Sequence, residues 1–206
     1  MSASSAVSQL PWMWLVSRAS GLMLLVLFST VFVLGISTRL GAQLRSMPRF
    51  AVAELHRTLA LFSVALLALH VATAVLDPYV SIGWWAAVLP FTAHYRPLAL
   101  SIGTVAVDLG AAVLITSLVR RRLGHRLWRT VHWLAYASWP LAFMHSLSAG
   151  NDMSIWWVAA IVWGSASAVA LAVVDRILLT RQSRKRTIQR LNPAVGAISA
   201  CPGVRS

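Results

Sequence analysis

Apolar residues fall into five long runs that are separated by shorter polar segments. The runs cover residues 12–36, 50–76, 97–119, 127–149 and 153–179. A helix that crosses the apolar part of a bilayer needs about 20 residues, and each run reaches that length. The pattern predicts an all-α fold, a polytopic membrane helix bundle of five spans.

The connection between the second and third runs is itself fairly apolar. It extends from Asp77 to Arg96 and holds the adjacent Trp84 and Trp85. Prolines interrupt it, and tryptophans favour the membrane–water boundary. We expect a short interfacial segment here rather than a sixth span.

The two ends of the chain differ from the runs between them. Residues 1–11 carry no basic stretch and no cleavage pattern, so the first run is predicted to be a retained span behind an outer N-terminal segment. The transmembrane domain is expected to cover 12–179. Residues 180–206 are basic, contain Pro and Gly and lack apolar periodicity, which predicts a disordered tail.

Basic residues gather in alternate connections. The chain has a net charge of +13, although only 11% of its residues are charged. The arginines lie at 39–49, in "RRRLGHRLWR" (120–129) and in "RQSRKRTIQR" (181–190), whereas Arg96 is the one basic residue of the other connections. The positive-inside rule then predicts a plasma-membrane protein with its N-terminus outside and its C-terminus in the cytoplasm. Topology and contact with anionic lipid account for the charge, so nucleic acid is not an expected partner.

Four histidines occupy two of the predicted spans at matching depths. His56 and His70 lie in "ELHRTLALFSVALLALHVATAVL", and His132 and His145 lie in "VHWLAYASWPLAFMHSL". The steps of fourteen and thirteen residues correspond to about 21 and 20 Å of helix. Both spans run outward, so His56 is expected near His132 on the cytoplasmic side, and His70 near His145 on the outer side.

Each facing pair offers two axial imidazoles to a haem iron. The absence of a C-x-x-C-H sequence excludes covalent attachment, so two b-type haems are the candidate cofactors. The alternative is structural, because an intramembrane histidine also serves as a hydrogen-bonding group between helices. Zinc or copper fits less well, since each pair lacks the further ligands that these ions need.

The thirteen-residue step raises a question of orientation. At about 100° per residue, fourteen residues return to within roughly 40° of the starting face, but thirteen leave His145 roughly 140° away from His132. Pro140 lies between them and is expected to distort the helix. Trp139 lies about halfway along the same step, where it either packs against other helices or separates the two haems.

Four arginines are candidate haem-binding residues: Arg18, Arg57 and Arg129 as partners for the propionates, and Arg96 in the outer loop as a cover for the outer haem. Arg57 and Arg129 are also explained by the positive-inside rule, whereas Arg18 lies within a span and needs a partner. Asp108 lies in the third span, where we expect a counter-ion for Arg18, a proton-relay group, or a neutral, protonated Asp bonded to a neighbouring helix. It supports an alternative function, in which the histidines and Asp108 make a proton or metal-ion transporter or channel.

The paired histidines and the stretch "RRRLGHRLWRTVHWLAYASWPLAFMHS" resemble the ferric reductase-like transmembrane domain of ferric reductases and NADPH oxidases. They are also similar to the haem-binding membrane subunit of the bacterial methionine sulfoxide reductase system. The resemblance extends from Trp12 to about Leu179. It implies two b haems, ligated by His56, His70, His132 and His145, and a role in electron transfer.

Ferric reductases and NADPH oxidases carry a cytoplasmic extension that binds FAD and NAD(P)H. The 180–206 tail is too short for such domains, and the chain has no Gly-rich dinucleotide fingerprint. The segments "PFTAHYRP" and "HSLSAGND" are similar in style to those of stand-alone actinobacterial members. We therefore expect the membrane component of an oxidoreductase. Its electrons would come from a separate flavoprotein or a quinol and pass to an acceptor on the outer side.

Overall fold

The computed structural model describes residues 12–40, 48–77, 82–150 and 152–199, and these residues form helices and no strand. The α-helices are α2 (Trp12–Leu40), α3 (Arg49–Leu76), α4 (Pro97–Leu118), α5 (Arg120–Leu123), α6 (His125–His132), α7 (Ala135–Ala149) and α8 (Trp156–Ser199). Two short 3₁₀ helices, η1 (Trp84–Ala87) and η2 (Asp152–Ser154), lie in the connections. The predicted all-α membrane bundle is confirmed.

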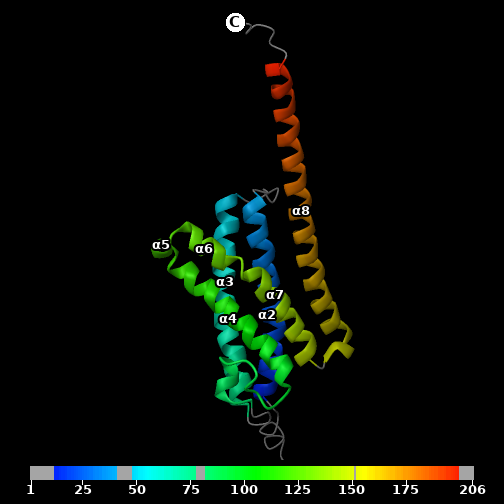
Figure 1. Cartoon of the computed structure of the whole chain (residues 1–206). Helices are drawn as coiled ribbons and strands as arrows, with labels where there is room; N and C mark the ends of the chain where they lie inside the picture. The colour runs from blue at the N-terminus through cyan, green and yellow to red at the C-terminus, as the bar shows by residue number, and fades with distance from the viewer. Residues whose placement is uncertain (1–11, 41–47, 78–81, 151, 200–206) are drawn as a thin grey trace, which may run out of the picture.

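Two antiparallel helix pairs organise the bundle (Figure 1). Helix α2 packs along α3, and α4 packs along α7, while α2 also contacts α7 and α8. Within the described ranges, α3 has extensive packing only with α2, and a small contact with η1. Helix α3 is therefore supported from one side, and its other side faces the α4–α7 pair across a cavity.

The buried core lies where α2, α7 and α8 meet. Phe32, Ile36, Trp139 and Val169 form one apolar cluster there. The indole Nε1–H of Trp139 donates to Ser29 Oγ at 3.0 Å, so a buried donor on α7 is satisfied by α2. Trp139 thus packs between helices, which is one of the two roles expected for it.

Four continuous helical segments are long and apolar enough to cross a bilayer, whereas the sequence predicted five spans. They are Trp12–Ser37, Phe50–Leu76, Pro97–Leu118 and Trp156–Arg184. The remaining predicted span, 127–149, is divided between α6 and α7, because α6 ends at His132 and α7 begins at Ala135. The prediction of five continuous spans is corrected to four such helices and one broken segment.

The break between α6 and α7 consists of tightened turns. The N–H groups of Trp133, Leu134, Tyr136 and Ala137 donate to the carbonyl three residues earlier. Residues in such turns rotate about 120° each about the helix axis instead of about 100°. The added rotation reduces the angle between the directions of His132 and His145 that thirteen α-helical residues would leave. The expected distortion therefore exists, but it precedes Pro140, which lies inside α7.

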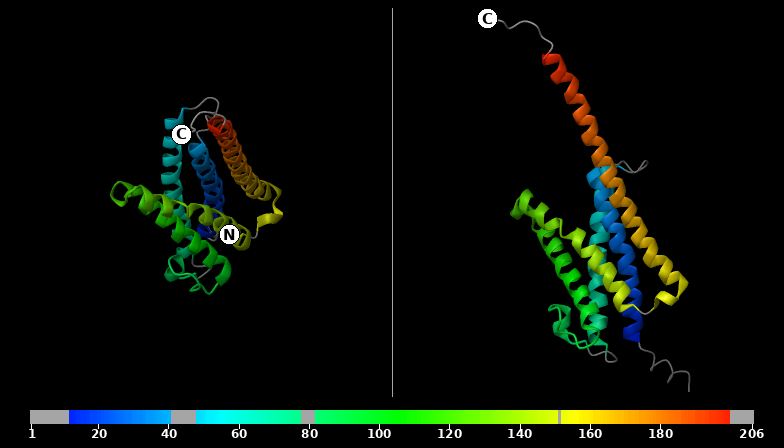
Figure 2. Two further views of the ribbon diagram at one scale, coloured as in Figure 1. Left: turned by 45° about the horizontal axis from the view of Figure 1, so that its top comes forward. Right: turned by 45° about the vertical axis from the view of Figure 1, so that its right-hand side comes forward.

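The interfacial segment expected between the second and third spans is present as η1. Trp84 and Trp85 are both exposed, and Thr104 Oγ1 of α4 donates to Ala86 O at 2.7 Å. This hydrogen bond holds η1 against α4, at the end of the bundle opposite to α5 (Figure 2).

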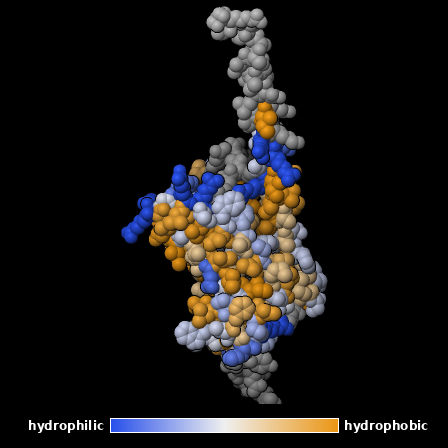
Figure 3. Space-filling view, in the orientation of Figure 1, coloured by the Kyte–Doolittle hydropathy of each residue, from blue (hydrophilic) through white to orange (hydrophobic). Residues whose placement is uncertain are grey.

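Helix α8 differs most from its predicted form. The sequence predicted a disordered tail from residue 180, but α8 continues as one helix to Ser199 and leaves the bundle (Figure 1). Residues 181–190 lack Gly and Pro and are rich in Arg, Lys and Gln, which favour helix. Basic side chains gather at the end of the bundle where α5 lies and α8 departs, beyond the apolar middle (Figure 3).

The Ser29–Trp139 hydrogen bond gives a stability prediction. We expect Ser29→Ala to lower the free energy of unfolding by about 1–3 kcal/mol, because the buried indole N–H loses its acceptor. Thr30→Ala is the control, since Thr30 is exposed and bonds within its own helix; a change within about 0.5 kcal/mol is expected. Thermal unfolding in detergent measures both, and equal effects would contradict the assignment.

Candidate functional site

A cavity of about 2080 Å³ lies between α3 and the α4–α7 pair, with α2, η1 and α8 contributing to its wall. Pockets for single small molecules occupy about 300–1,000 Å³, so the volume of this cavity is about twice the upper end of that range. All four predicted histidines line it: His56, His70, His132 and His145. The structure thus brings the predicted site residues of α3, α6 and α7 to one cavity.

The two histidines of α3 are both oriented by backbone carbonyls of α2. His56 Nδ1 lies 2.9 Å from Val31 O, and His70 Nδ1 lies 2.8 Å from Ser17 O. A carbonyl oxygen only accepts, so Nδ1 carries the proton in each ring. In the neutral imidazole, Nε2 then keeps its lone pair and is the nitrogen left for a ligand in the cavity.

The same α2 helix lets these rings approach closely because it carries glycine opposite each of them. A Cβ on Gly35 would lie 3.2 Å from Cε1 of His56, and a Cβ on Gly21 would lie 2.9 Å from Cε1 of His70. The two glycines are fourteen residues apart, as are the two histidines. Since α2 and α3 are antiparallel, equal steps keep both contacts in register.

His145 has the equivalent arrangement on the other helix pair. Its Nδ1 lies 2.8 Å from Ala99 O of α4 and donates to that carbonyl. A Cβ on Gly103 would lie only 2.5 Å from this Nδ1. The imidazole of α7 therefore lies directly against the α4 backbone.

His132 is positioned differently, at the end of α6. The centroid of its ring lies 5.1 Å from the ring centroid of Trp128. The indole Nε1–H of Trp128 donates to Ser117 Oγ of α4 at 3.3 Å. No described glycine lies so close to His132 that an added Cβ would meet its side chain within 4 Å. An aromatic neighbour on its own helix, rather than a glycine on the facing helix, borders this histidine.

Helical rise predicts that His70 pairs with His145 and that His56 pairs with His132. His70 and His145 are close enough to interact electrostatically. His56 and His132 both line the cavity, as do Arg57 and Arg129, and the pairing of these two histidines stays a prediction. That the four side chains ligate iron stays a prediction.

Three of the four candidate arginines line the cavity: Arg18, Arg57 and Arg129. The guanidinium of Arg18 also lies 4.5 Å from the ring centroid of Trp14. Arg96 does not line the cavity; its Nη1 donates to Ser148 O at 3.0 Å and caps the C-terminal turn of α7. This contact supports the helix that carries His145.

Asp108 lies outside this site. Its side chain is on the exposed face of α4, and it does not line the cavity. No ion pair between Asp108 and Arg18 is found in the described part of the chain, and of the two only Arg18 lines the cavity. The transporter or channel reading, which combined Asp108 with the histidines, gains no support from this position.

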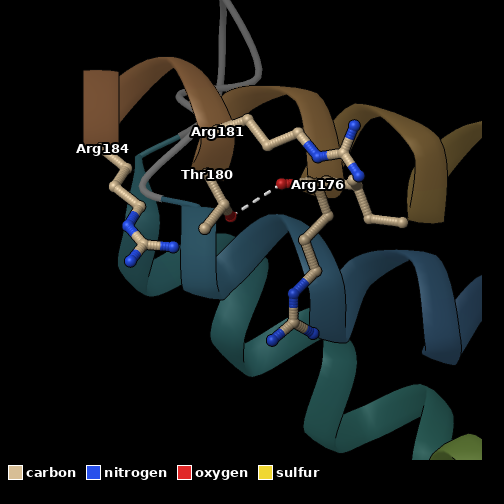
Figure 4. A pocket seen from close by; sticks show the side chains of 5 residues that line it. Arg176, Thr180, Arg181 and Arg184 are labelled. Carbon is tan, nitrogen blue, oxygen red and sulfur yellow. Dashed lines mark hydrogen bonds between the residues drawn. The ribbon is translucent and has the colours of Figure 1, made fainter. Parts of the chain in front are cut away.

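A second, smaller cleft of about 370 Å³ lies on α8 and is lined by Arg176, Thr180, Arg181 and Arg184, with Ile177 (Figure 4). The arginine side chains extend in different directions and do not converge on one point (Figure 4). Arg176 donates to the hydroxyl of Tyr136 and lies 5.1 Å from the ring centroid of Trp133. This arginine therefore attaches α8 to the break that precedes α7.

Sequence reasoning missed the three glycines that border the histidines. Gly21 and Gly35 had a signal, since their spacing equals that of His56 and His70. Using that signal requires knowing that α2 is the antiparallel neighbour of α3. Gly103 had no such signal, because no second glycine of α4 contacts a histidine.

Comparison with known proteins agrees with this architecture. The family model of the ferric reductase like transmembrane component matches residues 20–143, which is more than half of the chain. The chain belongs to this family, and this membership assigns it to membrane electron-transfer components. The matched range includes His56, His70 and His132 and ends just before His145. No curated protein and no solved structure gives a significant match.

The hydrogen bonds to carbonyls predict the tautomers of three histidines. In cofactor-free protein labelled with ¹⁵N-histidine, we expect His56, His70 and His145 to carry the proton on Nδ1. Solid-state NMR in bilayers distinguishes the two nitrogens. Assignment of the signals uses single His→Ala variants, and protonation on Nε2 at these positions would contradict the geometry.

Proposed function

We propose that this protein carries electrons across the membrane through two b-type haems. His56 and His132 would ligate one iron, and His70 and His145 the other. The observation that carries the proposal is the pairing of three cavity-lining imidazoles with backbone carbonyls. A histidine that binds metal commonly donates its other ring N–H to a carbonyl or carboxylate, which fixes both its tautomer and its orientation.

The cavity also suits two porphyrins in size and chemistry. Its volume of about 2080 Å³ exceeds the roughly 300–1,000 Å³ of a single-ligand pocket, and its walls are mostly apolar. Arg18, Arg57 and Arg129 line the cavity and would supply cations for the propionate groups. Haem iron, when bound, supplies one-electron redox chemistry, while the helices hold the ligands and limit access of water.

The direction across the membrane follows from charge. The end of the bundle with Arg120–Arg122 is proposed to face the cytoplasm, because basic residues favour that side. There, a separate flavoprotein or a quinol would deliver electrons to the His56–His132 pair. The His70–His145 pair would pass them to an acceptor on the outer side of the plasma membrane. The chain would thus act as a membrane component of an oxidoreductase.

Haem content tests the proposal directly. Purified protein should show the reduced-minus-oxidised spectrum of b-type haem, and His70→Ala or His145→Ala should each remove one of two haems, because one axial ligand is lost. His94→Ala is the matched control, since His94 is exposed and does not line the cavity. Absence of haem from the unmodified protein, or equal content in all three variants, would refute the proposal.

The single cysteine provides a test of orientation. Cys201 is the chain's one thiol, and the proposed topology puts it in the cytoplasm. A membrane-impermeant maleimide should therefore label it only after cells are permeabilised. In a Cys201→Ser background, Ser4→Cys should react in intact cells. The reverse pattern of labelling would overturn the orientation and leave the haem proposal intact.

A further inference from the structure

The three histidines that donate to carbonyls share one local arrangement, which we call a glycine notch. A glycine notch is a glycine on the neighbouring helix together with the carbonyl four residues before it. The three notches are Gly21 with Ser17 O, Gly35 with Val31 O, and Gly103 with Ala99 O. They face His70, His56 and His145 in that order, and they occur on two different helices, α2 and α4.

The spacing of four has a physical reason. In a helix, each Cα–Cβ bond tilts toward the N-terminus, so a side chain covers the turn that precedes its own Cα. The side chain four residues after a carbonyl therefore covers that carbonyl. Glycine leaves it uncovered, and its second lone pair can accept an N–H from outside the helix.

The tightness of the three notches differs. The nearest histidine atom would lie 2.5 Å from a Cβ on Gly103, 2.9 Å from one on Gly21 and 3.2 Å from one on Gly35. The nearest atoms to each added Cβ belong to the imidazole side chain, so we expect an added methyl group to displace the imidazole. The displacement required is largest for His145 and smallest for His56.

We infer that Gly21, Gly35 and Gly103 are positioning residues, which fix the plane and tautomer of the imidazoles that ligate haem. This inference rests on the proposed function. It also makes the two sites unequal. Both ligands of the His70–His145 site lie in glycine notches, whereas in the other site only His56 does, because His132 borders Trp128 instead.

Glycine-to-alanine variants test the inference, and the chain provides matched controls. Gly110 lies on α4 like Gly103, but an added Cβ meets only Ser138 Oγ at an ordinary 3.7 Å, and Gly164 on α8 meets nothing within 4 Å. All five glycines lie within helices, so alanine raises helix propensity at each position alike. A difference between the variants therefore reports the contact with histidine.

The first readout is the low-spin ferric EPR spectrum and the midpoint potential of each haem, because both depend on the orientation and hydrogen bonding of the axial imidazoles. Gly103→Ala is expected to alter or remove the signal of the His70–His145 site. Gly21→Ala should affect the same site less strongly. Gly35→Ala should shift only the other site, and Gly110→Ala and Gly164→Ala should match the unmodified protein.

The second readout needs no haem. In cofactor-free protein labelled with ¹⁵N-histidine, Gly103→Ala should remove the hydrogen-bonded Nδ1–H signal of His145 and leave His56 unchanged. Gly35→Ala, the mildest overlap, should do the converse. It serves as the second variant if Gly103→Ala reduces the yield of folded protein.

The outcomes separate the two proposals. If the unmodified protein binds no haem, the proposed function fails, and the NMR experiment still decides whether the glycines position the histidines. If it binds haem but Gly103→Ala and Gly35→Ala match Gly110→Ala in EPR, potential and NMR, the positioning role is wrong and the proposed function stands.

Discussion

The hydrogen bond from a histidine Nδ1–H to a backbone carbonyl of the next helix is the interaction on which this site depends. Inside a bilayer there is no water to accept that proton, so an imidazole needs an acceptor within the protein. Helix carbonyls are already bonded, but each keeps a second lone pair. Glycine at the right position makes this lone pair reachable. One backbone interaction thus satisfies the ring, selects its tautomer and aims Nε2 at the cavity.

The same interaction explains how the bundle keeps a large cavity. Within the described ranges α3 packs extensively only on α2, and the glycines of α2 let the histidines of α3 lie against its backbone. The core of α2, α7 and α8 holds the second wall through Phe32, Ile36 and Trp139. Helix α3 and the α4–α7 pair therefore lie on opposite sides of the cavity.

Hydrophobic periodicity and helical rise predicted much of this protein. They located four membrane helices and η1, and they identified the four histidines that line the cavity, because span length and the position of a residue within it depend only on distance along a helix. The distortion expected from Pro140 is present in the turns from Trp133 to Ala137, just before it, where a proline ring crowds the carbonyl four residues earlier. The predictions failed where neighbouring segments matter. The basic composition beyond residue 180 predicted disorder, but α8 continues there as a helix. Charge alone does not exclude a helix, because Arg, Lys and Gln favour it.

The sequence by itself determined that the chain is a membrane helix bundle and that His56, His70, His132 and His145 are its unusual intramembrane groups, since burial of apolar surface and the cost of polar groups in lipid are local properties. Only the tertiary structure decided which helices face one another. The packing of the helices places Gly21, Gly35 and Gly103 against histidines. It also brings Arg96 to the C-terminal end of α7 and leaves Asp108 outside the cavity. Contacts between segments far apart in the chain depend on packing of whole helices, which no local pattern specifies.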